Sequence, residues 1–166
     1  SDTFCYLITN SEKIAKLVNQ IILKLLPTIQ RKELVKSSLS KNGFIAVCKN
    51  SSDMINLANS LAPEHLQIMT KNSKLISSKI NTAGLVLLGN YSPSSASDYI
   101  LGSNHILPTN GFGKIRGSLS VMDFIKINTE VTASKLSLSK ISKHLDTLTT
   151  SEGLPNHYEA VRGRLQ

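Results

Sequence analysis

Hydrophobic residues follow two different spacings along the first half of the chain. Short, continuous apolar runs predict strands at residues 4–9, 44–48, 66–69 and 84–89. Between these runs, apolar residues recur every three or four positions and predict helices at residues 12–26, 31–39, 51–62 and 73–80. Strands that are apolar throughout, instead of at every second position, are typical of a parallel sheet covered by helices. The pattern therefore predicts an α/β fold, part of a doubly wound, mostly parallel sheet domain.

The pattern changes after Gly89. Residues 90–118 are rich in serine, proline and glycine, and they include Asp98, Tyr99 and His105. A loop of this length in a compact domain is usually either functional or disordered. Because it carries side chains that can bind ligands or move protons, we favour a functional, active-site loop.

Helical spacing returns at Thr132, which indicates a long helix in the last part of the chain. Gly153 and Pro155 interrupt this spacing before a final helix, which we predict at residues 158–165. Two helices behind a long loop predict a small helical C-terminal arm.

Length and composition indicate a globular protein. The chain has 166 residues, of which 40% are hydrophobic and 18% are charged, and this balance is not that of a disordered protein. We expect two domains. Residues 1–128 would form the second half of an α/β domain with its active-site loop, and residues 129–166 would form the helical arm.

Charge and hydropathy argue against two classes of partner. No apolar run approaches the roughly 20 residues of a membrane span, and no basic and apolar leader opens the chain, so we expect a cytoplasmic location and no membrane partner. The formal net charge is +8, which raises the question of nucleic-acid binding. Lysines are spread along the whole chain, however, and aromatic residues do not alternate with them as in a base-stacking surface. We therefore expect no nucleic-acid partner.

Candidate chemistry is concentrated in four segments that hold three of the chain's four histidines. These segments are Ala62-Pro63-Glu64-His65-Leu66, Asp98-Tyr99, Asn104-His105-Ile106-Leu107-Pro108-Thr109 and Glu152-Gly153-Leu154-Pro155-Asn156-His157. Each of the three histidines lies close in sequence to a carboxylate. Such a pair can provide a base, a proton relay or two metal ligands, so the segments suggest one assembled site.

The residues alone leave a structural interpretation open for each of these positions. Glu64 and His65 are equally compatible with two exposed polar residues after a helix-ending proline. Asp98 can be a turn residue in a serine-rich loop, and His157 can be a surface cap. The fourth histidine, His144, lies on the exposed face of a predicted helix, and we interpret it as solvated surface.

In order and spacing, the four segments resemble those of the histidinol dehydrogenases. The segment from Ala83-Gly84 to Leu88-Gly89, followed by Tyr91-Ser92-Pro93, extends the resemblance. It implies an enzyme of the last step of histidine biosynthesis, in which two successive hydride transfers to NAD convert L-histidinol through the aldehyde to L-histidine. It also implies zinc as a cofactor.

The resemblance assigns a role to each candidate residue. Glu64 and His65 would be the catalytic acid/base pair. His65 would take the proton from the substrate alcohol and later from the aldehyde hydrate, and Glu64 would activate the attacking water. Asp98 and His157 would be zinc ligands. The side chains that contact the substrate would be those of His65, Asp98, His105, Glu152 and His157.

The resemblance also implies a homodimer with C-terminal arm exchange. Members of the family are intertwined dimers in which this arm reaches across to the partner's active site. Residues 129–166 would then be a dimerisation arm, and its Glu152 and His157 would complete the site of the partner.

The chain departs from the family in ways that limit the expected activity. It resembles only the C-terminal part, and it opens just after the place where the family has two further zinc ligands, a Gln and a His. The NAD-binding domain is also missing from it, and no glycine-rich phosphate loop replaces that domain. In addition, Ser97 stands where the family usually has glycine. We therefore expect the isolated chain to be inactive; the alternative is a non-catalytic metal- or partner-binding module derived from this fold.

Overall fold

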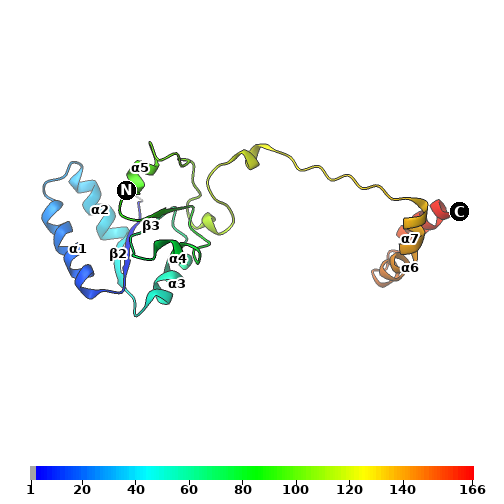
Figure 1. Ribbon diagram of the computed structural model, residues 1–166, viewed down its shortest axis with the longest axis horizontal. Coiled ribbons are helices and arrows are strands. Elements are labelled where there is room, and N and C mark those ends of the chain that lie inside the picture. Colours follow the sequence, from blue (N-terminus) through cyan, green and yellow to red (C-terminus); the bar gives the residue numbers. More distant parts are fainter. Residues whose placement is uncertain (1–2) are drawn as a thin grey trace. The chain divides into compact units, whose positions relative to one another are not determined.

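The computed structural model describes residues 3–166 and contains two compact units (Figure 1). The first unit ends at Asp123 and combines strands with helices, and the second comprises Phe124–Gln166 and is helical. This composition confirms the predicted α/β class. In the described part of the chain, no helix is both long and apolar enough to cross a membrane.

Strands and helices alternate through the first unit, as the apolar spacing predicts. In chain order they are β1 (Cys5–Thr9), α1 (Glu12–Leu25), α2 (Lys32–Asn42), β2 (Gly43–Val47), α3 (Ser51–Leu61), β3 (His65–Ile68), α4 (Ser73–Ser77), β4 (Leu85–Leu88) and α5 (Ser94–Ser97). Two short 3₁₀ helices follow, at Phe112–Lys114 and Val121–Phe124.

The four strands form two parallel pairs instead of one continuous sheet. β1 pairs with β2 and β3 pairs with β4, and a ladder between the two pairs is absent from the described residues. Helices connect the two strands of each pair, because parallel strands require a crossover. In the second pair, His65 lies opposite Leu85. His65 is the first residue of β3, so its side chain lies where the chain enters that strand.

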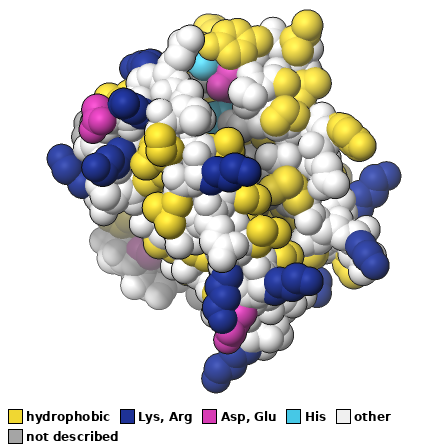
Figure 2. All heavy atoms as spheres, turned by 90° about the vertical axis from the view of Figure 1, so that its left-hand side faces the viewer, with side chains coloured by type: hydrophobic (Ala, Val, Ile, Leu, Met, Phe, Trp, Pro, Cys, Tyr) yellow, Lys and Arg dark blue, Asp and Glu magenta, His cyan; other side chains and the backbone are white. Residues whose placement is uncertain are grey.

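The hydrophobic core of this unit is small. Among the described residues, its buried apolar side chains are Ala15, Ala58, Ala62, Ile68 and Leu87. Larger apolar side chains of α1 remain in solvent, and Leu17, for example, is 51% exposed. Figure 2 shows apolar side chains on the molecular surface, with lysine and arginine side chains scattered among them.

Local sequence signals set the ends of α3. Asn50 caps the helix by accepting a hydrogen bond from the backbone N–H of Asp53, at 2.9 Å. At the other end, Ala62 adopts a left-handed conformation with φ 46°, and Pro63 follows. Proline disfavours a helical conformation of the residue before it, so the chain leaves the helix here and turns into β3.

The second unit is a pair of helices, α6 (Lys135–Ser151) and α7 (Pro155–Leu165), which pack against each other. The predicted start of the last helix, at about residue 158, is wrong, because α7 begins at Pro155. Proline is well tolerated in the first turn of a helix, where its missing N–H would have no partner within the helix. The turn between the helices uses Gly153, whose φ of 71° favours glycine.

Candidate active site

The backbone of Glu64 and His65 is held by the strand beside it. The N–H of Gly84 donates to the carbonyl oxygen of Pro63 at 3.0 Å, and the N–H of Leu85 donates to that of Glu64 at 2.8 Å. Glycine is required at position 84, because a Cβ there would lie 2.8 Å from the Glu64 carbonyl oxygen and 3.0 Å from Cδ of Pro108. The absence of a side chain at Gly84 therefore lets the Glu64 backbone and the loop that carries Pro108 pack closely against this strand.

Asp98 is presented by the end of the short helix α5. It is the C-cap residue of that helix and directly follows Ser97, which is only 2% exposed. The Ser97 hydroxyl donates to the carbonyl oxygen of Ser94 at 2.7 Å. The serine at this position is thus accommodated within the turn that aims Asp98.

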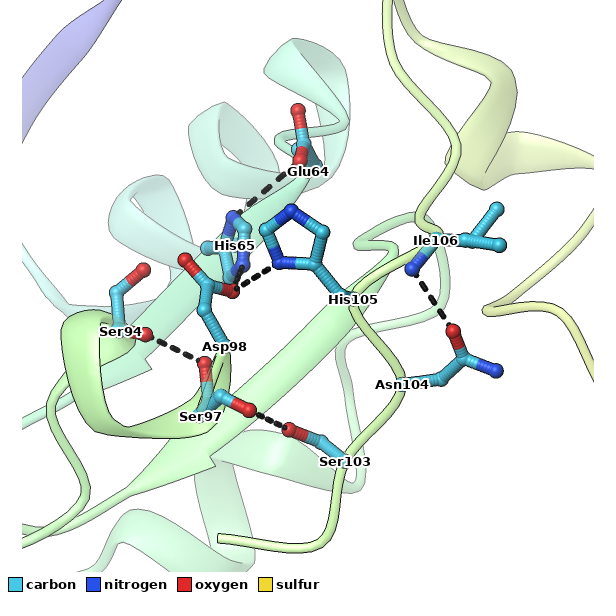
Figure 3. Close-up of polar contacts among 9 residues, drawn as sticks. All are labelled: Glu64, His65, Ser94, Ser97, Asp98, Ser103, Asn104, His105 and Ile106. Atoms are coloured by element: carbon cyan, nitrogen blue, oxygen red, sulfur yellow. Dashed lines mark hydrogen bonds and ion pairs between the residues drawn. The ribbon is translucent and has the colours of Figure 1, made fainter. Parts of the chain in front are cut away.

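Four of the predicted site residues meet in the first unit (Figure 3). His65 Nε2 lies 3.1 Å from Asp98 Oδ1, and His105 Nδ1 lies 3.5 Å from the same oxygen. On the opposite side of its ring, His65 Nδ1 lies 3.7 Å from Glu64 Oε1. One carboxylate oxygen therefore faces two imidazoles, and one imidazole lies between two carboxylates.

The cluster has an enclosed side and an open side. The side chains of His65 and Asp98 are 21% and 23% exposed, whereas those of Glu64 and His105 are 41% and 73% exposed. In Figure 2, histidine and acidic side chains are visible together at the surface, beside apolar side chains. A ligand can therefore reach the ring of His65 from solvent.

This arrangement can carry out proton transfer. A neutral imidazole donates a hydrogen bond from one ring nitrogen and accepts one at the other. A neighbouring carboxylate accepts the hydrogen bond and so fixes which of the two nitrogens carries the proton. The carboxylate also stabilises the imidazolium that forms when the ring takes a second proton. His65, between Glu64 and Asp98, is placed for general acid/base catalysis.

The two remaining predicted residues, Glu152 and His157, lie in the second unit. Glu152 is the C-cap residue of α6, and His157 lies in the first turn of α7, where its N–H donates to the carbonyl oxygen of Leu154 at 3.1 Å. Both side chains are exposed.

The described residues do not complete a metal site. They contain no group of three or more histidine, cysteine, aspartate or glutamate side chains arranged to hold a metal ion. Asp98 and His157 offer an oxygen and an imidazole nitrogen, which are ligands that zinc accepts, but zinc sites usually have three or four protein ligands. The donor types therefore fit zinc, and further ligands are needed.

Two residues to which the sequence motifs assign no role, Ser103 and Asn104, support the cluster. Ser103 and Asn104 hold the loop around His105 through side-chain hydrogen bonds to the backbone of Ser97, Ile106 and Leu119. Serine and asparagine side chains in loops often form hydrogen bonds with nearby backbone groups. Their presence beside His105 is therefore the one sequence feature that indicates such a role. The sequence does not reveal which distant backbone group each one meets.

Comparison with known proteins gives consistent matches along the whole chain. A family model described as histidinol dehydrogenase matches residues 1–165. A histidinol dehydrogenase of Oceanobacillus iheyensis is 41% identical over 157 residues, which are 95% of this chain and 37% of the relative. One of Methanopyrus kandleri is 38% identical over 159 residues, with the same coverage of both chains.

A solved structure agrees with these sequence matches. The crystal structure of histidinol dehydrogenase from Elizabethkingia anophelis aligns with a TM-score of 0.84 and 33% identity, over 96% of this chain and 37% of that one. The present chain thus spans a little over a third of the length of the relatives that it matches.

Proposed function

Because the chain belongs to the histidinol dehydrogenase family, as its motifs suggest, we propose that it supplies the acid/base part of an active site that oxidises L-histidinol to L-histidine. The family itself implies a place in histidine biosynthesis. The assignment of acid/base chemistry to this chain is supported most directly by the His65 ring. Its Nε2 lies 3.1 Å from Asp98, and Glu64 lies on the other side of the ring.

His65 is proposed to act as the base in both oxidation steps. In the first step it removes the hydroxyl proton of the alcohol while the carbon loses its hydride, and an aldehyde results. After His65 has released the first proton to solvent, it removes a hydroxyl proton of the aldehyde hydrate while the carbon loses a second hydride, and the carboxylic acid results, which ionises to the carboxylate. Hydride loss from carbon requires the oxygen to lose its proton, and an imidazole held beside a carboxylate is suited to this task.

Glu64 is proposed to activate water between the two oxidations. Its side chain is more exposed than that of His65, so water can reach its free oxygen. By accepting a proton from that water, it assists addition to the aldehyde carbon. NAD would supply the hydride acceptor when bound, and no residue of this chain is assigned to hold it.

The remaining site residues are proposed to bind and orient the substrate. Asp98 and His157 would hold zinc together with ligands from outside this chain, and the metal would supply a fixed charge that orients the imidazole and amino groups of histidinol. His105 and Glu152 would contact the substrate directly.

The second unit is proposed to act as a dimerisation arm. Residues 129–166 would exchange between two copies, so that Glu152 and His157 of one copy complete the site of the other. The exposure of both side chains supports this proposal, because residues that contact another subunit must be accessible to solvent in the single chain.

A chimera tests the proposed function. The region of the Oceanobacillus iheyensis enzyme that matches this chain is replaced by residues 1–166, and NADH formation from L-histidinol is measured for the chimera and for the 166-residue chain alone. We expect turnover by the chimera and none by the chain alone. A folded chimera without turnover would contradict the proposal and favour a non-catalytic binding module.

A further inference from the structure

His105 is the most exposed member of the cluster, and it lies in a loop. Its side chain is 73% exposed, and its Nδ1 lies 3.5 Å from Asp98 Oδ1. The helices and strands of the described residues do not include it. Because neither close packing nor a regular element fixes this side chain, its direction depends on the backbone on either side of it.

Asn104 fixes that backbone with both ends of its amide. Its Nδ2 donates to the carbonyl oxygen of Leu119 at 2.7 Å, and its Oδ1 accepts from the N–H of Ile106 at 2.8 Å. The N–H of Leu119 in turn donates to the carbonyl oxygen of Ile106 at 3.0 Å. These three hydrogen bonds hold the backbone on both sides of His105, which lies between Asn104 and Ile106 in the chain.

Ser103 links the same loop to Asp98. Its hydroxyl donates to the backbone carbonyl of Ser97 at 2.7 Å, and Ser97 directly precedes Asp98 (Figure 3). Ser97 is buried, so its carbonyl is a firm anchor. The two ends of the His105–Asp98 contact are thus held within one network, in which Ser103 fixes the spacing and Asn104 fixes the His105 backbone.

We propose that Asn104 is a positioning residue, which holds the His105 imidazole against Asp98 through its bonds to Ile106 and Leu119. The proposal rests on the function above only for the statement that His105 contacts substrate. Removing the amide leaves a carbonyl and an N–H without their partner and frees the loop to move. A displacement of about 1 Å at a catalytic site can lower the rate by roughly a hundredfold.

Nuclear magnetic resonance of the 166-residue chain tests the geometry without any assumption about activity. Asn104→Ala is expected to move the ring signals of His105 toward those of a free histidine and to leave the ring signals of His144 unchanged. Asn19→Ala, an exposed position of α1, is the matched control. Unchanged His105 signals in Asn104→Ala would overturn the proposal.

A double-mutant cycle in the chimera tests whether Asn104 acts through His105. We expect Asn104→Ala to lower kcat/KM about tenfold and His105→Asn to lower it further, and we expect the double variant to match His105→Asn. Losses that multiply in the double variant would overturn the proposal, because they would indicate a general structural role. If His65→Asn leaves turnover intact, the proposed function is wrong, and the His105 ring signals still decide the role of Asn104.

Discussion

Among single residues, Asp98 has the central place in the candidate site, because one of its oxygen atoms faces two histidines. Asp98 Oδ1 faces His65 Nε2 and His105 Nδ1, although His65 lies 33 positions earlier in the sequence. His65 is the more enclosed of the two histidines, so its orientation is the better defined. Asp98 is therefore positioned to orient both imidazoles.

Substitution of Asp98 by asparagine tests this organising role. The amide would keep the shape of the side chain but lose its negative charge, so it would neither stabilise an imidazolium nor serve as a strong metal ligand. In the chimera, we expect Asp98→Asn to lower kcat/KM for L-histidinol about 10–100-fold. Asp146→Asn, at an exposed position of α6, is the matched control. Equal activities of the two variants would show that Asp98 is not part of the site.

The close approach at Gly84 gives a prediction about stability. A Cβ at this position would lie 2.8 Å from a backbone oxygen, whereas a Cβ at Gly117 would have no atom within 4 Å. We expect Gly84→Ala to lower the free energy of unfolding by about 1–3 kcal/mol, as overpacking does elsewhere. Gly117→Ala should change it little. Urea unfolding of both variants, followed by circular dichroism, gives the comparison, and equal midpoints would rule out the steric argument.

The identity of the clustered residues could be predicted from the sequence, but their support could not. Glu64, His65, Asp98 and His105 stand in motifs whose order and spacing are informative by themselves. Asn104 was visible only as a member of such a motif. Its partner Leu119 is 15 positions away within an irregular loop, and no periodicity links the two.

At the scale of elements, helix ends position the chemistry. α3 must stop where it does for β3 to begin at His65, directly after Glu64, and the left-handed Ala62 followed by Pro63 provides this stop. The strand and helix spacings predicted nearly all elements of the first unit. They could not predict how strands pair, because pairing depends on contacts between distant parts of the chain.

The cap of α3 gives a prediction at this scale. Asn50→Ala removes the side-chain acceptor for the N–H of Asp53 and should lower the free energy of unfolding by about 1 kcal/mol. Asn50→Ser keeps a neutral side-chain acceptor and is expected to retain most of the stability, whereas aspartate would face the Asp53 carboxylate, to which the Asn50 amide donates at 3.1 Å. Chemical denaturation of the wild-type protein and the two variants is the measurement. A serine variant as unstable as the alanine variant would show that the cap is not the cause.

In the molecule as a whole, the residues proposed for the site are divided between two units. Glu64, His65, Asp98 and His105 lie in the first, and Glu152 and His157 lie in the second. The chain also spans only a little over a third of its relatives. The proposed function therefore needs groups that the first unit does not contain, and arm exchange is the proposed source of Glu152 and His157.

Complementation between two inactive chimeras tests arm exchange. One chimera carries His65→Asn and the other carries His157→Ala, and the two are unfolded together and refolded as a mixture. If His157 serves the partner's site, each mixed dimer has one intact site, and about a quarter of the wild-type activity should return. If His157 serves its own subunit, every site in the mixture has a defect, and activity should stay absent.

His65 is proposed to be the base for histidinol oxidation. The most direct measurement is steady-state NADH formation from L-histidinol by the chimera with His65→Asn, beside the chimera with His144→Asn, whose histidine is exposed on α6. Loss of a general base typically lowers the rate about 10²–10⁴-fold, and we predict a fall in kcat of this size for His65→Asn and no change for His144→Asn. Equal kcat values for the two variants would contradict the claim.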